Sequence, residues 1–134
     1  MEKNLKKTVF ILLLLVSSLF AELKNESLSQ KLLDSKIPIV DIRTPTEWKQ
    51  TGIIKGSIPI MFFTQNGGYD IKDFLTKLNA KVDTTKPFAL ICRTGSRTKI
   101  VSAYLSKELN YKVTNISGGI MYPSMKNPPF VKYK

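Results

Sequence analysis

The sequence predicts a three-layer α/β fold, in which a mainly parallel sheet of about five strands has helices on both faces. The first observation is an apolar run, Phe88–Ile91, bounded by Pro87 and by a loop that contains Gly95. Such a run is typical of a buried parallel strand. The second is that apolar residues recur at three- and four-residue spacing after the loop, which predicts a helix over about 97–109. A strand followed directly by a helix is the repeating unit of such folds.

Residues 1–21 have the layout of a secretory signal peptide. Three lysines precede an uninterrupted apolar stretch, Val9–Val16, and small residues follow it up to Ala21. We expect cleavage after Ala21 and, in a bacterium, export to the periplasm. The alternative is an uncleaved N-terminal membrane anchor, although the apolar stretch is shorter than the roughly 20 residues of a spanning helix. Residues 22–134 then form one domain, with a core at about 27–123.

The other elements are predicted from apolar spacing, caps and breakers: a helix near 28–33, a strand at 37–42, a helix at 46–50, a strand at 58–61, a helix near 70–79 and a strand at 112–116. Ser27 or Ser29 caps the first helix, and Thr44 caps the second, where Pro45 suits a first helical turn. Residues 51–57 form a turn. The tail, 123–134, is expected to be extended and partly loose.

Cys92 begins the loop between the apolar strand and its helix. Free amides of a helix start, successive loop N–H groups and two arginines, Arg93 and Arg97, surround its sulfur. These groups favour the thiolate over the thiol and would bind an anion presented to it. We therefore predict that Cys92 is a nucleophile. The alternative is an inert cysteine that ends a buried strand.

The composition excludes several kinds of site. The single cysteine permits neither an internal disulfide nor Cys-x-x-Cys chemistry, and the absence of histidine removes Cys-His and Ser-His-Asp mechanisms and typical zinc sites. No metal is expected. The chain has 21 basic and 10 acidic residues, a formal net charge of +11, which suits an anionic substrate or an acidic partner protein. Because the lysines are scattered, without an arginine-rich run, nucleic acid is not an expected partner.

Three stretches resemble the rhodanese-type sulfurtransferases. Cys92–Arg97 resembles their active-site loop, a Cys-x-x-Gly-x-Arg pattern, and 40–59 resembles their N-terminal signature. Ser117–Ile120 resembles their C-terminal glycine pair, whose simplest role is a tight turn, with close approach to the active-site loop as the alternative. The sequence departs from the family at Ile53, where a histidine is common. The resemblance covers about 27–123 and implies the rhodanese fold.

The resemblance also implies a reaction. Cys92 would take sulfur from an anionic donor such as thiosulfate or polysulfide, become a persulfide, and pass the sulfur to a thiol or cyanide. The residues that would bind the donor and the persulfide follow in the loop: Arg93, Thr94, Gly95, Ser96 and Arg97. Arg97 could instead point away and brace the loop. Asp41 and Arg43 are expected to support the site, in an ion-pair network with Glu47. No metal or organic cofactor is implied.

Two other functions stay open. A partner-loaded persulfide carrier or binding module would accept sulfur stoichiometrically and show little free turnover. Phosphatases and arsenate reductases that share this fold carry their arginine six positions after the cysteine. Here the arginine comes at the fifth position and Thr98 occupies the sixth. Because the longer loop suits the wider phosphate dianion, the sequence disfavours these activities.

Overall fold

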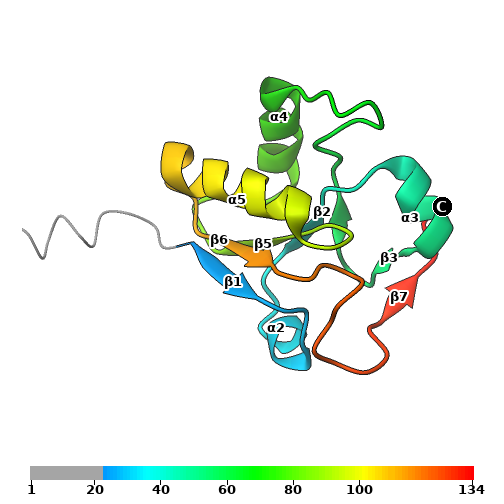
Figure 1. Cartoon of the computed structure of the whole chain (residues 1–134). Helices are drawn as coiled ribbons and strands as arrows, with labels where there is room; N and C mark the ends of the chain where they lie inside the picture. Colours follow the sequence, from blue (N-terminus) through cyan, green and yellow to red (C-terminus); the bar gives the residue numbers. More distant parts are fainter. Residues whose placement is uncertain (1–22) are drawn as a thin grey trace, which may run out of the picture.

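The computed structural model describes residues 23–134, so the expected signal peptide lies outside the described residues. The main sheet has the strand order β1-β6-β5-β2-β4, and every pairing in it is parallel, as predicted (Figure 1). Its strands are β1 (Lys24–Glu26), β2 (Ile39–Asp41), β4 (Ile58–Pro59), β5 (Phe88–Ile91) and β6 (Val113–Ile116). The edge strand β1 was not predicted. The apolar run β5 occupies the centre of the sheet.

The helices of the described chain are α2 (Gln30–Asp34), α3 (Pro45–Thr51), α4 (Ile71–Lys81) and α5 (Ser96–Leu109). Helices α4 and α5 cover one face of the sheet, and α2 covers the other (Figure 1). Ser29 caps α2, and Thr44 caps α3 in a capping box with Glu47. No helix within residues 23–134 is long and apolar enough to cross a membrane.

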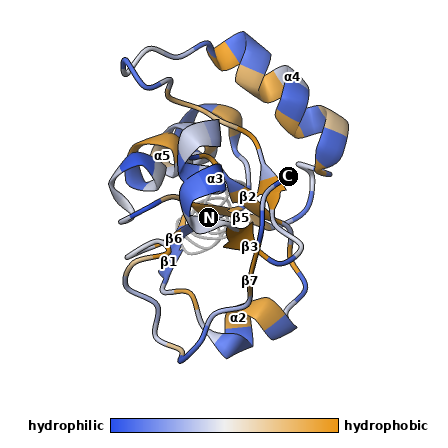
Figure 2. Cartoon of the chain, turned by 90° about the vertical axis from the view of Figure 1, so that its right-hand side faces the viewer, coloured by the Kyte–Doolittle hydropathy of each residue, from blue (hydrophilic) through white to orange (hydrophobic). Residues whose placement is uncertain are grey.

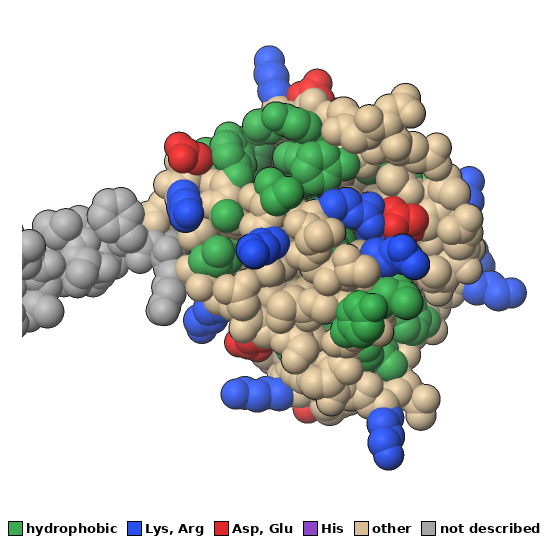
Figure 3. All heavy atoms as spheres, in the orientation of Figure 1, with side chains coloured by type: hydrophobic (Ala, Val, Ile, Leu, Met, Phe, Trp, Pro, Cys, Tyr) green, Lys and Arg blue, Asp and Glu red, His purple; other side chains and the backbone are tan. Residues whose placement is uncertain are grey.

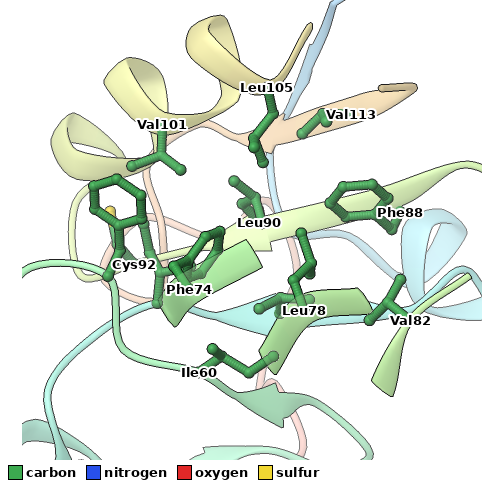
Figure 4. Packing of buried hydrophobic residues seen from close by; sticks show 13 residues of the cluster. Ile60, Phe74, Leu78, Val82, Phe88, Leu90, Cys92, Val101, Leu105 and Val113 are labelled. Carbon is green, nitrogen blue, oxygen red and sulfur yellow. The ribbon is translucent and has the colours of Figure 1, made fainter. Parts of the chain in front are cut away.

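Side chains of β5 alternate between two hydrophobic cores. Phe88 and Leu90 lie in the core beneath α4 and α5, whereas Ala89 and Ile91 lie in the core that faces α2. All four are fully buried, which is why this strand reads as a continuous apolar run. Figure 2 shows the hydrophobic strands at the centre and helices of mixed character around them, and Figure 4 shows the larger core, with Cys92 among its members.

The tail returns to the domain and forms a second, two-stranded sheet. Strand β7 (Phe130–Val131) pairs antiparallel with β3 (Ile53–Ile54). The rings of Tyr133 and Trp48 lie 5.2 Å apart between centroids, which attaches the end of the chain to α3. The tail is therefore extended, as predicted, and its end, which was expected to be partly loose, is attached to the domain. The turn predicted over 51–57 is confined to the two residues after β3.

Candidate active site

Cys92 directly follows β5 at the carboxyl edge of the sheet, where open α/β sheets bind ligands. It is a free cysteine, and its side chain is fully buried at one end of the core beneath α4 and α5 (Figure 4). The sequence correctly placed this residue between a buried strand and a helix start, and its burial is what the alternative of a cysteine ending a buried strand also expected.

Gly95 directs a hydrogen-bond donor at the sulfur. Its N–H donates to Cys92 Sγ over 3.1 Å, and the Thr98 hydroxyl lies 3.5 Å from the same atom. Gly95 is the N-cap of α5 and has a left-handed backbone, with φ of 93°. That conformation is readily adopted by glycine alone, and it lets the loop turn its amide back towards the preceding strand. A Cβ here would also lie 2.8 Å from the Gly118 nitrogen.

The two glycines after β6 pack directly against the active-site loop. The N–H of Ile120 donates to the Cys92 carbonyl over 3.0 Å, and the N–H of Met121 donates to the Arg93 carbonyl over 3.1 Å. A Cβ on Gly119 would overlap both of these carbonyl oxygens. The turn therefore holds the first half of the loop in place, in addition to reversing the chain. Close approach was the alternative role that the sequence left open for this pair.

Arg97 is held by Glu47, which lies 50 residues earlier in the chain. Its two terminal nitrogens donate to the two carboxylate oxygens over 2.8 and 2.7 Å, a bidentate pair that joins α5 to α3. Arg97 therefore braces the loop, because its guanidinium is bound to Glu47 beside the loop. The hydrogen bond from Arg97, with help from the Thr44 N–H and against the effect of burial, lowers the pKa of Glu47 from 4.5 to about 2. The same bond raises the pKa of Arg97.

This brace is expected to weaken in acid. Because the pKa of Glu47 is lower in the folded protein, its contribution is complete above pH 4.5 and is lost as the pH falls towards about 2. Glu47→Gln should lower the free energy of unfolding by about 1 kcal/mol at neutral pH, since the pair is partly exposed. Urea titrations should show the difference from the native protein shrinking across this range. A stability difference between Glu47→Gln and the native protein that does not change with pH would contradict the role given to the Glu47 carboxylate.

An exposed ion pair provides the matched control. Lys77 and Asp73 lie on one face of α4 at 2.7 Å, with both side chains more than half exposed. Asp73→Asn should change the stability at neutral pH by less than Glu47→Gln does, since solvent screens an exposed pair. An equal loss of stability from the two substitutions would indicate that the Glu47–Arg97 pair stabilises the fold no more than an exposed ion pair does.

Asp41 and Arg43 form a separate, buried ion pair at the end of β2. The shortest contact, from Arg43 Nη2 to Asp41 Oδ2, measures 2.7 Å, and both side chains are essentially inaccessible. Arg43 also donates to the Thr51 hydroxyl over 2.7 Å and to the Gly52 carbonyl over 2.8 Å, which ties β2 to the end of α3. The predicted single network with Glu47 is therefore wrong, because the Glu47 carboxylate is taken by Arg97 and by the capping box.

A groove of about 680 Å³ lies beside the loop. Its lining comes from the active-site loop, α3, the start of α5 and the segment after β4: Thr44, Thr46, Glu47, Phe63, Thr64, Gln65, Gly67, Arg93, Ser96, Arg97 and Ile100. Figure 3 shows basic and acidic side chains side by side between two hydrophobic areas, one over α4 and α5 and one over the segment after β6. Ile100, which lines the groove, is an exposed apolar residue, and so are Met121 and Tyr122 in the turn after β6.

The predicted substrate-binding residues occupy different places in this arrangement. Arg93 and Ser96 are exposed on the groove wall, and Thr94 is exposed with its hydroxyl 3.4 Å from that of Ser96. Gly95 is buried against the sulfur, and Arg97 is held by Glu47. The contact with Thr98 and the groove wall after β4 were not predicted from the sequence. Thr98 could have been singled out in the sequence because it is a hydroxyl residue on the buried face of the helix that follows Cys92.

Residues 24–122 match the model of the rhodanese-like domain family. The chain is 30% identical over 112 residues to a sulfurtransferase of Allochromatium vinosum, covering 82% of this chain and 94% of that protein. It is 34% identical over 92 residues to an uncharacterized protein of Rickettsia prowazekii, covering 66% and 72%. Its fold is similar to that of a rhodanese-like domain protein from Staphylococcus aureus, with a TM-score of 0.59, 24% identity and coverage of 81% and 99%. The chain therefore belongs to the rhodanese-like domain family.

Proposed function

We propose that this protein is a sulfurtransferase that moves a sulfane sulfur through a persulfide on Cys92. The donor is an anion, thiosulfate or polysulfide, and the acceptor is a thiol or cyanide. The observation that carries the proposal is the sulfur of Cys92 at the carboxyl end of β5, with the Gly95 N–H directed at it over 3.1 Å. Family membership supports the same chemistry.

The reaction has two steps and needs no metal or organic cofactor. The Cys92 thiolate attacks the outer sulfur of thiosulfate, a sulfur–sulfur bond forms to Sγ, and the donor's own bond breaks with its electron pair leaving on sulfite. An acceptor thiolate or cyanide then attacks the outer sulfur of the persulfide, and the electron pair returns to Sγ. The Gly95 N–H and the start of α5 stabilise negative charge at the sulfur in both steps.

The substrate contacts are assigned from the positions of the loop residues. Arg93 and Ser96 line the groove, so we assign them, with Thr94, to attraction and binding of the anionic donor. Arg97 also lines the groove, but it is assigned mainly to holding the loop, since Glu47 occupies its terminal nitrogens. Asp41 and Arg43 are assigned a supporting role because they join β2 to the end of α3.

A second candidate function is that of a persulfide carrier loaded by a partner protein. Cys92 is fully buried, whereas the groove beside it, about 680 Å³, is far larger than a thiosulfate ion requires. Two exposed apolar residues, Ile100 at 64% on the groove wall and Tyr122 at 67% in the turn after β6, are contacts that a small inorganic anion does not need but a protein partner would. The basic surface would suit an acidic partner.

Intact mass measurement tests both candidates. The native protein and Cys92→Ser are treated with thiosulfate, with polysulfide or with neither. We expect the native protein alone to gain the mass of one sulfur atom, which cyanide then removes. Adduct formation on Cys92→Ser would refute the site assignment. Uptake from polysulfide with weak steady-state turnover would favour the carrier. The mass of the protein from a periplasmic fraction also tests the proposed export and the cleavage after Ala21.

A further inference from the structure

A buried hydroxyl accompanies the sulfur of Cys92. Thr98 lies in the first turn of α5, is fully inaccessible, and places its Oγ1 3.5 Å from Sγ. The same hydroxyl donates to the Gly95 carbonyl over 3.2 Å, while the Gly95 N–H donates to Sγ. The sulfur, the hydroxyl and the backbone of Gly95 therefore form a closed set of contacts. A threonine hydroxyl can donate one hydrogen bond and accept two, so it can accept from a thiol and donate to a thiolate.

The hydroxyl can change its partner without leaving a buried group unsatisfied. The Gly95 carbonyl also accepts a hydrogen bond from the Lys99 N–H over 3.1 Å. When Cys92 is a thiol, its S–H can donate to Oγ1 while the hydroxyl donates to Gly95. When Cys92 is a thiolate, the hydroxyl can rotate towards Sγ, and Lys99 alone satisfies the carbonyl. The usual cost of an unpaired buried acceptor is thereby avoided.

We propose that the Thr98 hydroxyl is a hydrogen-bond switch that follows the charge on Sγ during the sulfur transfer proposed above. It donates to the thiolate that attacks the donor. In the persulfide Sγ carries no charge, and the hydroxyl returns to the Gly95 carbonyl. When the acceptor removes the outer sulfur, the sulfur–sulfur bond breaks, its electron pair returns to Sγ, and the hydroxyl donates to it again. No proton leaves the hydroxyl at any step, so Thr98 is a positioning and charge-stabilising residue.

The charged groups around the sulfur stay the same when Thr98 is changed. Arg97 on α5 interacts electrostatically with Cys92, and Arg97 is in turn under the influence of Glu47 on α3 and of Asp41 at the end of β2. None of these residues bonds to the Thr98 hydroxyl in the described contacts. A change in the ionisation of Cys92 on removing this hydroxyl therefore reports on the hydroxyl itself.

The first test is a titration of the thiolate by its ultraviolet absorbance, which needs no reagent to reach the buried sulfur. Cys92 is the only cysteine, so Cys92→Ser supplies the blank. In Thr98→Val the midpoint should rise by about one pH unit, a tenfold change in the ratio of thiol to thiolate, because a hydrogen bond to a charged group is lost. Thr98→Ser should keep the native midpoint. Should Thr98→Val fail to fold, Thr98→Ala takes its place.

Ser102 provides the matched control on the same helix. It is also fully buried, and its hydroxyl donates to the Thr98 carbonyl over 2.5 Å, away from the sulfur. Ser102→Ala removes a buried hydroxyl from α5 and should leave the midpoint unchanged. A shift as large as that of Thr98→Val would mean that the titration follows helix packing, and it would overturn the switch.

The second test measures discharge of the persulfide in a single turnover. Protein loaded with polysulfide is mixed with cyanide, and the loss of one sulfur mass is followed in time. Thr98→Val should discharge about tenfold more slowly than the native protein, and Thr98→Ser close to the native rate. If the native protein takes no sulfur, the proposed function fails while the titration still tests Thr98. If Thr98→Val titrates and discharges like the native protein, the switch is wrong.

Discussion

Replacing Asp41 by asparagine should lower the free energy of unfolding by about 3–5 kcal/mol, because it leaves the Arg43 guanidinium as a buried charge without its counter-ion. The side chains of Asp41 and Arg43 are 0% and 1% exposed. Arg43 Nε and Nη2 donate to the carboxylate over 3.0 and 2.7 Å. Asparagine keeps the shape of the side chain, so urea unfolding of Asp41→Asn measures chiefly the loss of charge.

A double-mutant cycle separates the pair from the packing around it. Arg43→Met should destabilise the protein to a similar degree, because Asp41 is then the unpaired buried charge. Combining Arg43→Met with Asp41→Asn should cost less than the sum of the two, since no isolated charge remains. Additive losses would show that the two side chains act independently. A loss below about 1 kcal/mol for either single variant would contradict the supporting role.

The parallel core of the fold could be predicted because its central strands are buried on both faces. β5 and its helix have clear apolar patterns, and all four residues of the strand are inaccessible. β1 could not be found in this way. Its three residues are polar and exposed, and it belongs to the sheet through backbone pairing with β6. β3 and β7 have two residues each and lie far apart in the sequence, so no local pattern indicates their pairing.

The position of the candidate site could be predicted, but the directions of its side chains could not. The loop pattern placed Cys92 at the edge of the sheet. The same pattern left Arg97 either facing a donor or bracing the loop, and the choice depends on Glu47, which is distant in sequence. The contact of Thr98 with the sulfur likewise depends on the left-handed turn at Gly95, the N-cap of α5. Tertiary contacts decided each of these points.

Replacing Gly119 by alanine should destabilise the protein by about 3 kcal/mol or more and sharply reduce sulfur uptake by Cys92. A Cβ at this position would overlap the carbonyl oxygens of Cys92 and Arg93, which are backbone atoms and cannot rotate away. The loop would have to move, and the hydrogen bonds that Ile120 and Met121 donate to those carbonyls would be lost. Urea unfolding and the intact-mass assay measure the two effects.

Gly56→Ala is the control that separates steric overlap from backbone strain. Gly56 has φ of 80° and no atom within 4 Å of its would-be Cβ, whereas Gly119 has φ of 56° and two carbonyls in the way. Gly56→Ala should therefore cost only the strain of a left-handed alanine, about 1–2 kcal/mol, and leave sulfur uptake intact. If Gly119→Ala behaves in the same way, the glycine is needed only for its φ. The larger loss would instead show that the turn after β6 holds the active-site loop in place.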